Sequence, residues 1–337
     1  MKLSTNLQRF HNRTTYYLSV VGFFVIIALV IGAIYYATRQ IDYVWRWYKV
    51  PQYFVYEETV EIKSEIDGDV EKIEISGGDA TISVKGVDGS IETYRVPSKA
   101  DLRVADGDML SVGDTLGSYT HWKPGIMLQG LWITLLTSMY SIGFGIIIGL
   151  IGGVCRISPN PVLRWTAMTY VELVRGSPLL VQIFIWYFVL GTVINTMLAN
   201  RKWAQLSPLW FGVAALACFS GAYITEIVRA GIQSIHRGQI EASRSLGMSY
   251  GQSMRYVILP QALRRILPPL AGEFINLIKD SSLLGIIAVR ELTKATREVI
   301  TTSLQPFELF FTCALLYLLL TFTLSMAVQY LERRMSS

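Results

Sequence analysis

The chain has 337 residues, of which 52% are hydrophobic and 16% charged, and its mean hydropathy is +0.39. Because soluble domains carry about 25% charged residues, this composition indicates a membrane protein and argues against a soluble globular domain. The three cysteines, Cys155, Cys218 and Cys313, all lie in apolar segments. They indicate neither a disulfide framework nor a metal site.

Charge is unevenly divided along the chain. From Arg39 to Lys123 there are ten Lys and Arg against sixteen Asp and Glu, whereas the remaining sequence carries twenty against nine. Short cytosolic loops of membrane proteins are rich in Lys and Arg, so we expect the acidic part to lie on the opposite side. A basic surplus is also typical of nucleic-acid-binding proteins. Here the basic residues flank apolar segments, and we expect no nucleic-acid partner.

The first apolar segment, residues 14–38, has no charged residue and is long enough to span ~30 Å of hydrocarbon. Lys2, Arg9 and Arg13 precede it, which predicts a cytosolic N-terminus over residues 1–13. A signal peptide is the alternative, but its apolar core would be shorter and an A-x-A site would follow. We therefore expect a retained membrane anchor.

Residues 39–123 are expected to form a small all-β domain outside the cytoplasm, in the periplasm. Four β-rich segments are separated by turn sequences: Val60–Ile66, Val70–Ile75, Ala80–Val84 and Ser90–Val96. Glu65–Ile75 and Val104–Tyr119 resemble the two halves of a biotinyl/lipoyl-like barrel-sandwich domain. Modified members carry an acceptor lysine in an M-K-M turn, which this sequence lacks. The resemblance therefore implies a structural or docking role rather than a swinging arm.

Residues 124–337 are expected to form a core of five membrane helices. The first, 124–155, contains Gly145, Gly149 and Gly153 at four-residue spacing. Small residues so spaced let membrane helices approach closely. Alternatively, glycine is simply common in such helices.

Two further spans are expected at 176–200 and 208–227. Near the cytosolic end of the second, Glu226 and Arg229 are three residues apart and can form an ion pair on one helix face. Charges at this depth mark either a substrate pathway or a structural clasp at the helix end.

The span at 266–289 is predicted from topology, because hydropathy alone misses it. It contains three charged residues: Glu273, Lys279 and Asp280. If the loop at 236–265 and the basic C-terminus are both cytosolic, two crossings must separate them, and the last span, 307–331, supplies one. Residues 266–289 must then supply the other, with their charges facing protein or a cavity. Six crossings with both termini cytosolic are expected.

The loop at 236–265 is expected to form two short helices. Gly247 is suited to cap the first, of about nine residues. Ser249 and Gln252 match a capping box that begins the second helix, and Pro260 is expected to end it.

Glu241-Ala242-Ser243, with Gly247 six residues after Glu241, resembles the EAA loop of ABC importer permeases of the polar amino-acid uptake family. Three other stretches resemble that family too: Tyr170–Gln182, Tyr223–Ile235 and Glu273–Gly285. The resemblance covers roughly residues 125–331. It implies that the loop forms a coupling helix that docks into a cytosolic ATPase, through Glu241, Ala242, Ser243 and Gly247. Ser243 replaces the family's second alanine.

The resemblance also implies that this chain lies in the bacterial inner membrane. The partners that it implies are a cytosolic ABC ATPase dimer, a second permease subunit, identical or homologous, and a periplasmic amino-acid-binding protein. The sequence contains no G-x-x-x-x-G-K-[ST] pattern, so ATP and Mg²⁺ are expected on the ATPase and no cofactor or metal on this chain. The three histidines lie far apart, and no catalytic residue is predicted: His11, His121 and His236.

Polar residues near the expected membrane core are candidates for the substrate pathway: Glu226, Arg229, Glu273, Lys279, Asp280, Ser281 and Ser282. A zwitterionic amino acid would need an anionic and a cationic partner, which these residues could supply. Alternatively, they hold the fifth span, 266–289, against its neighbours. The rival function is a membrane-anchored adaptor of an efflux or sensory assembly, although the long helical hairpin of such adaptors is not visible.

Overall fold

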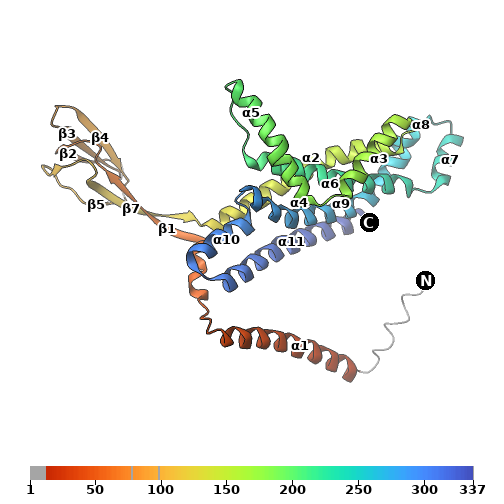
Figure 1. The fold of residues 1–337 in the computed structure, drawn as a ribbon, viewed down its shortest axis with the longest axis horizontal. Coiled ribbons are helices and arrows are strands. Elements are labelled where there is room, and N and C mark those ends of the chain that lie inside the picture. Colours follow the sequence, from red (N-terminus) through yellow and green to blue (C-terminus); the bar gives the residue numbers. More distant parts are fainter. Residues whose placement is uncertain (1–12, 77–78, 98, 337) are drawn as a thin grey trace. The chain divides into compact units, whose positions relative to one another are not determined.

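The computed structural model describes residues 13–76, 79–97 and 99–336 (Figure 1). The expected cytosolic residues 1–12 lie outside this range. The chain divides into two units, Met1–Trp47 and Tyr48–Ser337. In the first unit, helix α1 (Arg13–Gln40) is apolar, and none of its most apolar window is buried. A helix that is hydrophobic all round without protein cover is typical of a lipid-facing anchor.

After α1, the chain forms two short 3₁₀ turns, η2 (Trp47–Lys49) at the boundary between the units and η3 (Pro51–Tyr53), and then seven strands. The strands are β1 (Val55–Lys63), β2 (Gly68–Ser76), β3 (Asp79–Gly86), β4 (Ile91–Val96), β5 (Asp101–Leu102), β6 (Met109–Leu110) and β7 (Thr115–Pro124). They form two antiparallel sheets, ordered β1-β7-β5 and β4-β3-β2-β6. The strand predicted at 60–66 instead begins at Val55, because residues 55–59 pair with β7, far along the chain.

The two sheets share one hydrophobic core. Side chains of β3 alternate between buried and partly exposed, as expected for a strand with one face inward. Ile82 and Val84 from this strand meet Leu116 of β7, which belongs to the other sheet. The sheets are therefore held together by apolar residues at alternate positions.

The rest of the chain is helical. Its elements are α2 (Ile126–Ile157), α3 (Pro161–Arg175), α4 (Leu179–Phe184), the π-helical η4 (Ile185–Gly191), α5 (Thr192–Asn200), α6 (Pro208–Gln233), α7 (Arg237–Ser245), α8 (Tyr250–Ser253), the π-helical η5 (Met254–Ile258), α9 (Leu259–Asp280), the 3₁₀ segment η6 (Ser281–Ile287), α10 (Leu292–Ser303) and α11 (Pro306–Ser336).

Five described segments are long and apolar enough to cross a membrane: Tyr16–Gln40, Ile126–Ile157, Leu179–Asn200, Pro208–Gln233 and Pro306–Tyr330. They correspond to five of the six predicted spans. The sixth, 266–289, falls on α9 and η6 and does not meet this test, so that crossing stays a prediction from topology. Within that range the α-helix ends at Asp280 and gives way to the 3₁₀ segment.

Helix α6 is the central element of the helical core. Two thirds of its apolar window, 67%, is buried, against 33% for α2 and 17% for α11. Its glycine-lined neighbour α2 packs along it: Cβ atoms placed on Gly145, Gly149 and Gly153 would overlap side chains of α6. These glycines are therefore required for the close approach of the two helices. Their four-residue spacing thus serves helix packing and does not simply reflect the abundance of glycine in membrane helices.

The prediction that Pro260 ends a helix is wrong. Elements α8, η5 and α9 follow one another without a break, and Pro260 stands at the start of α9. Proline lacks the N–H group needed for a helical hydrogen bond. The π turn before it shifts the bonding pattern, with the Leu259 N–H donating to the Met254 carbonyl five residues earlier. A π-bulge of this kind accommodates the proline inside a continuous helix.

Candidate coupling loop and pathway site

Helix α7 has the predicted nine residues and is capped at both ends. At its start, Nδ1 of His236 accepts a hydrogen bond from the Gly238 N–H, at 3.1 Å. At its end, Gly247 has φ +80°, its N–H donates to the Arg244 carbonyl, and the Met248 N–H donates to the Ser243 carbonyl. These paired bonds form a Schellman motif, so the predicted role of Gly247 as a helix cap is confirmed.

The four predicted coupling residues do not share one environment. Glu241, Ala242 and Gly247 are exposed, as is the neighbouring Leu246, of which 82% is accessible. Ser243 is only 3% exposed, and its hydroxyl contacts that of Ser253 in α8. The exposed set can face a partner protein, whereas Ser243 fastens α7 to the helix that follows it.

The predicted capping box is present at the start of α8. The Gln252 N–H donates to Ser249 Oγ at 3.3 Å, and the Ser249 N–H donates to Gln252 Oε1 at 2.8 Å. Two longer connections brace the loop against the core. Gln261 of α9 donates to Gln239 of α7, and the Arg265 guanidinium donates to the Ser234 carbonyl at 2.6 Å. Helix α7 is thus tied to α9, and α9 is tied to the residue that follows α6.

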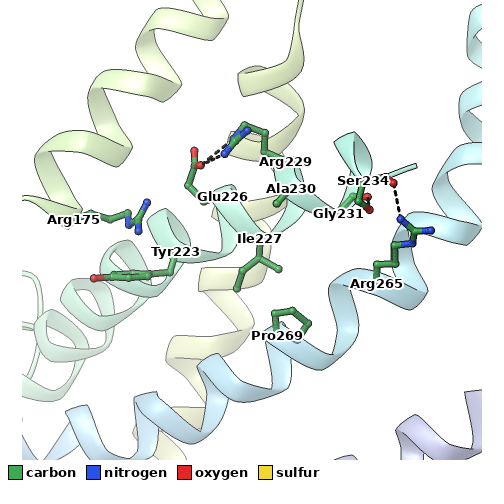
Figure 2. Close-up of a pocket in the computed structure, with 10 residues that line it drawn as sticks. All are labelled: Arg175, Tyr223, Glu226, Ile227, Arg229, Ala230, Gly231, Ser234, Arg265 and Pro269. Carbon is green, nitrogen blue, oxygen red and sulfur yellow. Dashed lines mark hydrogen bonds and ion pairs between the residues drawn. The ribbon is translucent and has the colours of Figure 1, made fainter. Parts of the chain in front are cut away.

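A cavity of about 560 Å³ lies beside the C-terminal half of α6 (Figure 2). Its charged lining residues are three arginines and one glutamate: Arg175, Arg229, Arg265 and Glu226. The Arg175 guanidinium lies over the Tyr223 ring, 5.0 Å from its centroid. Cationic and aromatic groups here surround a space large enough for a small zwitterion.

Glu226 joins two helices. Its Oε2 accepts hydrogen bonds from Arg229 at 2.6 and 2.9 Å, which confirms that the predicted pair can form on α6. Its Oε1 accepts one from Nε of Arg156, at the end of α2, at 3.0 Å. The side chains are 13–32% exposed, so this triad links α2 to α6 in a partly dehydrated setting.

Of the seven predicted pathway residues, Glu226 and Arg229 line this cavity. The other five, Glu273, Lys279, Asp280, Ser281 and Ser282, are not among its lining residues. Glu273 and Ser281 are buried, and the Ser281 hydroxyl, at the start of η6, donates to the Ile278 carbonyl of the preceding α9. The sequence reasoning missed Arg175, Tyr223 and Arg265 as lining residues, although the first two lie inside family-like stretches.

Within the described residues, no group of three or more His, Cys, Asp or Glu side chains is arranged to hold a metal ion.

Comparison with known proteins finds a family match in the helical core of the chain. Residues 141–337 match the family described as binding-protein-dependent transport system inner membrane component. The chain belongs to this family. The resemblance seen in the coupling loop is thereby confirmed, and the adaptor alternative is not favoured. As a member, the chain is the membrane permease subunit of an ABC transporter and not itself an enzyme.

Several relatives of this permease are similar over nearly their whole length. It is 38% identical over 208 residues to the probable glutamine ABC transporter permease protein GlnM of Bacillus subtilis, covering 62% of this chain and 92% of GlnM. It is 38% identical over 210 residues to the glutamine transport system permease protein GlnP of Escherichia coli K12, covering 62% and 93%. It is 37% identical over 228 residues to the L-cystine transport system permease protein TcyB of Bacillus subtilis, covering 66% and 94%.

Solved structures agree with this assignment. An amino acid ABC transporter crystallised with histidines is 35% identical to the permease, with a TM-score of 0.55, over 62% of this chain and 94% of that one. The MetNI methionine transporter, 23% identical with a TM-score of 0.54 over 62% and 96%, shares the fold. About a third of the permease thus lies outside its similarity to these transporters.

Proposed function

We propose that this permease forms the translocation pathway of an ATP-driven importer of amino acids. Relatives named for glutamine, L-cystine and arginine transport support the substrate class. The observation that carries the proposal is α7, a capped helix with an exposed face that is bonded to α9, which is in turn bonded to the end of α6. Such a helix can transmit a displacement from a partner to α9, and through α9 to the end of α6.

In this proposal a cytosolic ABC ATPase dimer binds ATP and Mg²⁺, and its closure moves α7. Glu241, Ala242 and Gly247 act in coupling, the first two by contact and the third by fixing the turn. Ser243 transmits the displacement inward through its contact with Ser253. A second permease subunit, identical or homologous, completes the pathway, and a periplasmic amino-acid-binding protein delivers the substrate.

The cavity beside α6 is proposed as part of the pathway. Glu226 already accepts from two arginines, and Arg265 is engaged with a carbonyl group. Arg175, stacked on Tyr223, is therefore the cation best placed to meet a substrate carboxylate. Of the five predicted residues from Glu273 to Ser282, the buried Glu273 and Ser281 instead help to hold α9 and η6 against the core.

The proposed topology has six crossings and both termini in the cytosol. It comprises the N-terminus 1–13, the anchor 14–38, the periplasmic β domain 39–123 and the permease core 124–337, with its coupling loop at 236–265. In this arrangement Leu304, 78% exposed between α10 and α11, faces the periplasm. A cysteine placed there should react with an impermeant maleimide added to intact spheroplasts, and one at Arg237 should not. The same labelling result at both positions would overturn the fifth crossing, and the reverse pattern would overturn the proposed orientation.

Purification of the tagged chain in mild detergent, followed by mass spectrometry, tests the assembly. Recovery of an ATPase and of an identical or different permease is expected. Reconstituted with the matching binding protein, the complex should show ATP-dependent uptake of a polar amino acid. Recovery of the chain alone, or with an outer-membrane channel, would contradict the importer.

A further inference from the structure

A second cavity, of about 830 Å³, lies between the coupling loop and the ends of α2 and α6. Three arginines line it, Arg156, Arg164 and Arg237, and no acidic residue does. Within the described residues, neither Arg164 nor Arg237 forms an ion pair, and only Nε of Arg156 is engaged, by Glu226. The cavity thus concentrates uncompensated positive charge, which would attract an anion.

The position of this cavity indicates the kind of anion. Arg156 stands next to the last residue of the span Ile126–Ile157, and Gln233, another lining residue, ends the span Pro208–Gln233. Two independent spans therefore end at the cavity, which places it at the level of one membrane surface. Lipid phosphate groups lie at that level.

The lining is also amphipathic. Beside the arginines, the side chains of Ile240, Met254 and Ile258 contribute an apolar wall. An inorganic anion would gain nothing from this wall, whereas the glycerol and upper acyl groups of a lipid would bury apolar surface against it.

Helix α3 supplies an independent indication that lipid reaches the site. Around Arg164 it exposes four large apolar side chains: Val162, Leu163, Trp165 and Met168. Val162 is 67% and Trp165 is 61% exposed. Apolar side chains with a tryptophan and an arginine on one short helix are typical of a segment at the membrane interface.

We propose that this cavity binds the head group of an anionic phospholipid from the cytosolic leaflet, with Arg164 and Arg237 contacting its phosphate. Because Arg237 and Ile240 belong to α7, the bound lipid would connect the coupling helix to α2 and α3. The proposal goes beyond amino-acid transport and does not depend on which substrate is carried.

The test uses the complete transporter complex, delipidated and titrated with phosphatidylglycerol or phosphatidylcholine, with binding read by native mass spectrometry. Each arginine at an anionic lipid surface is worth about 1 kcal/mol, so the double variant R164Q/R237Q should bind phosphatidylglycerol about 30-fold more weakly. The matched control R255Q removes an exposed arginine outside the cavity and should leave binding unchanged. The variant R164K/R237K keeps the charge and should retain most of the binding.

Two further measurements distinguish a bound lipid from other possible occupants of the cavity. Inorganic phosphate that displaced phosphatidylglycerol at equal concentration would overturn the proposal in favour of a soluble anion. Loss of the ATPase from R164Q/R237Q, with lipid binding unchanged, would overturn it in favour of a protein contact. Retention of the ATPase together with the 30-fold loss of lipid would support it, whether or not uptake itself is observed.

Discussion

At the scale of single residues, Gly247 sets the geometry of the coupling helix. With φ +80° it allows the two Schellman hydrogen bonds that end α7. A β-branched residue in this left-handed conformation costs about 1–2 kcal/mol, because its Cβ meets the adjacent carbonyl oxygen. The cost falls on the loop proposed to contact the ATPase and leaves the membrane helices intact.

Gly247→Val is therefore expected to abolish uptake while membrane insertion is preserved. Uptake into proteoliposomes and recovery from the membrane fraction are the two measurements. The matched control is Gly251→Val, because Gly251 is exposed, has no atoms within 4 Å of an added Cβ and has no left-handed φ. Normal transport by Gly247→Val would contradict the coupling role.

Glu226 offers a second residue-scale test, because it binds arginines from two helices. Glu226→Gln should lower the free energy of unfolding by about 1–2 kcal/mol, less than for a fully buried pair because these side chains are partly exposed. Thermal unfolding of the purified complex measures this. Glu298→Gln, which breaks the more exposed pair with Arg290, is the control and should change stability by less than about 1 kcal/mol. Equal effects of both changes would show that Glu226 is not a clasp.

At the scale of elements, the α2–α6 contact depends on small residues along one face of α2. Gly149 is buried against Ile224, whereas Gly143 is exposed with open space around it. Overpacking at a close helix contact costs about 1–3 kcal/mol, since the backbones must separate. The helix formed by α8, η5 and α9, in contrast, tolerates a residue that normally breaks helices. The π turn before Pro260 accommodates the hydrogen bond that proline cannot donate.

Gly149→Ala is accordingly expected to lower the melting temperature of the complex and reduce its yield. Gly143→Ala should leave both unchanged, although it adds the same methyl group to the same helix. Differential scanning fluorimetry in detergent compares the two variants directly. A similar melting temperature for both would mean that α2 and α6 can separate freely.

At the scale of the whole molecule, the two ends of the β region meet. Val55 of β1 pairs with Pro124 of β7, and the Gly125 N–H donates to the Phe54 carbonyl at 2.6 Å. A short glycine linker can therefore replace residues 56–123 without stretching the chain. The region is acidic, with sixteen Asp and Glu against ten Lys and Arg between Arg39 and Lys123, which suits contact with another protein outside the membrane.

Excision of residues 56–123 should leave assembly with the ATPase intact and weaken binding of the binding protein at least about tenfold, equivalent to ~1.4 kcal/mol. Co-purification measures assembly with the ATPase. Surface plasmon resonance with immobilised transporter measures the affinity for the binding protein. A second excision with a glycine linker of a different length controls for the join itself. Unchanged affinity and uptake would rule out a docking role with the binding protein.

The sequence by itself determined the features that depend on short windows: five apolar spans, the capping of α7 by Gly247, the capping box at Ser249 and Gln252, and the family through its EAA-like loop. Each follows from hydropathy or from hydrogen bonds between residues a few positions apart. The burial of Ser243 and the bond from Arg156 to Glu226, 70 residues apart, were decided by tertiary packing alone. So was the meeting of Arg175, Tyr223 and Arg265 around one cavity. Such contacts depend on which helix faces pack together, which no local pattern specifies.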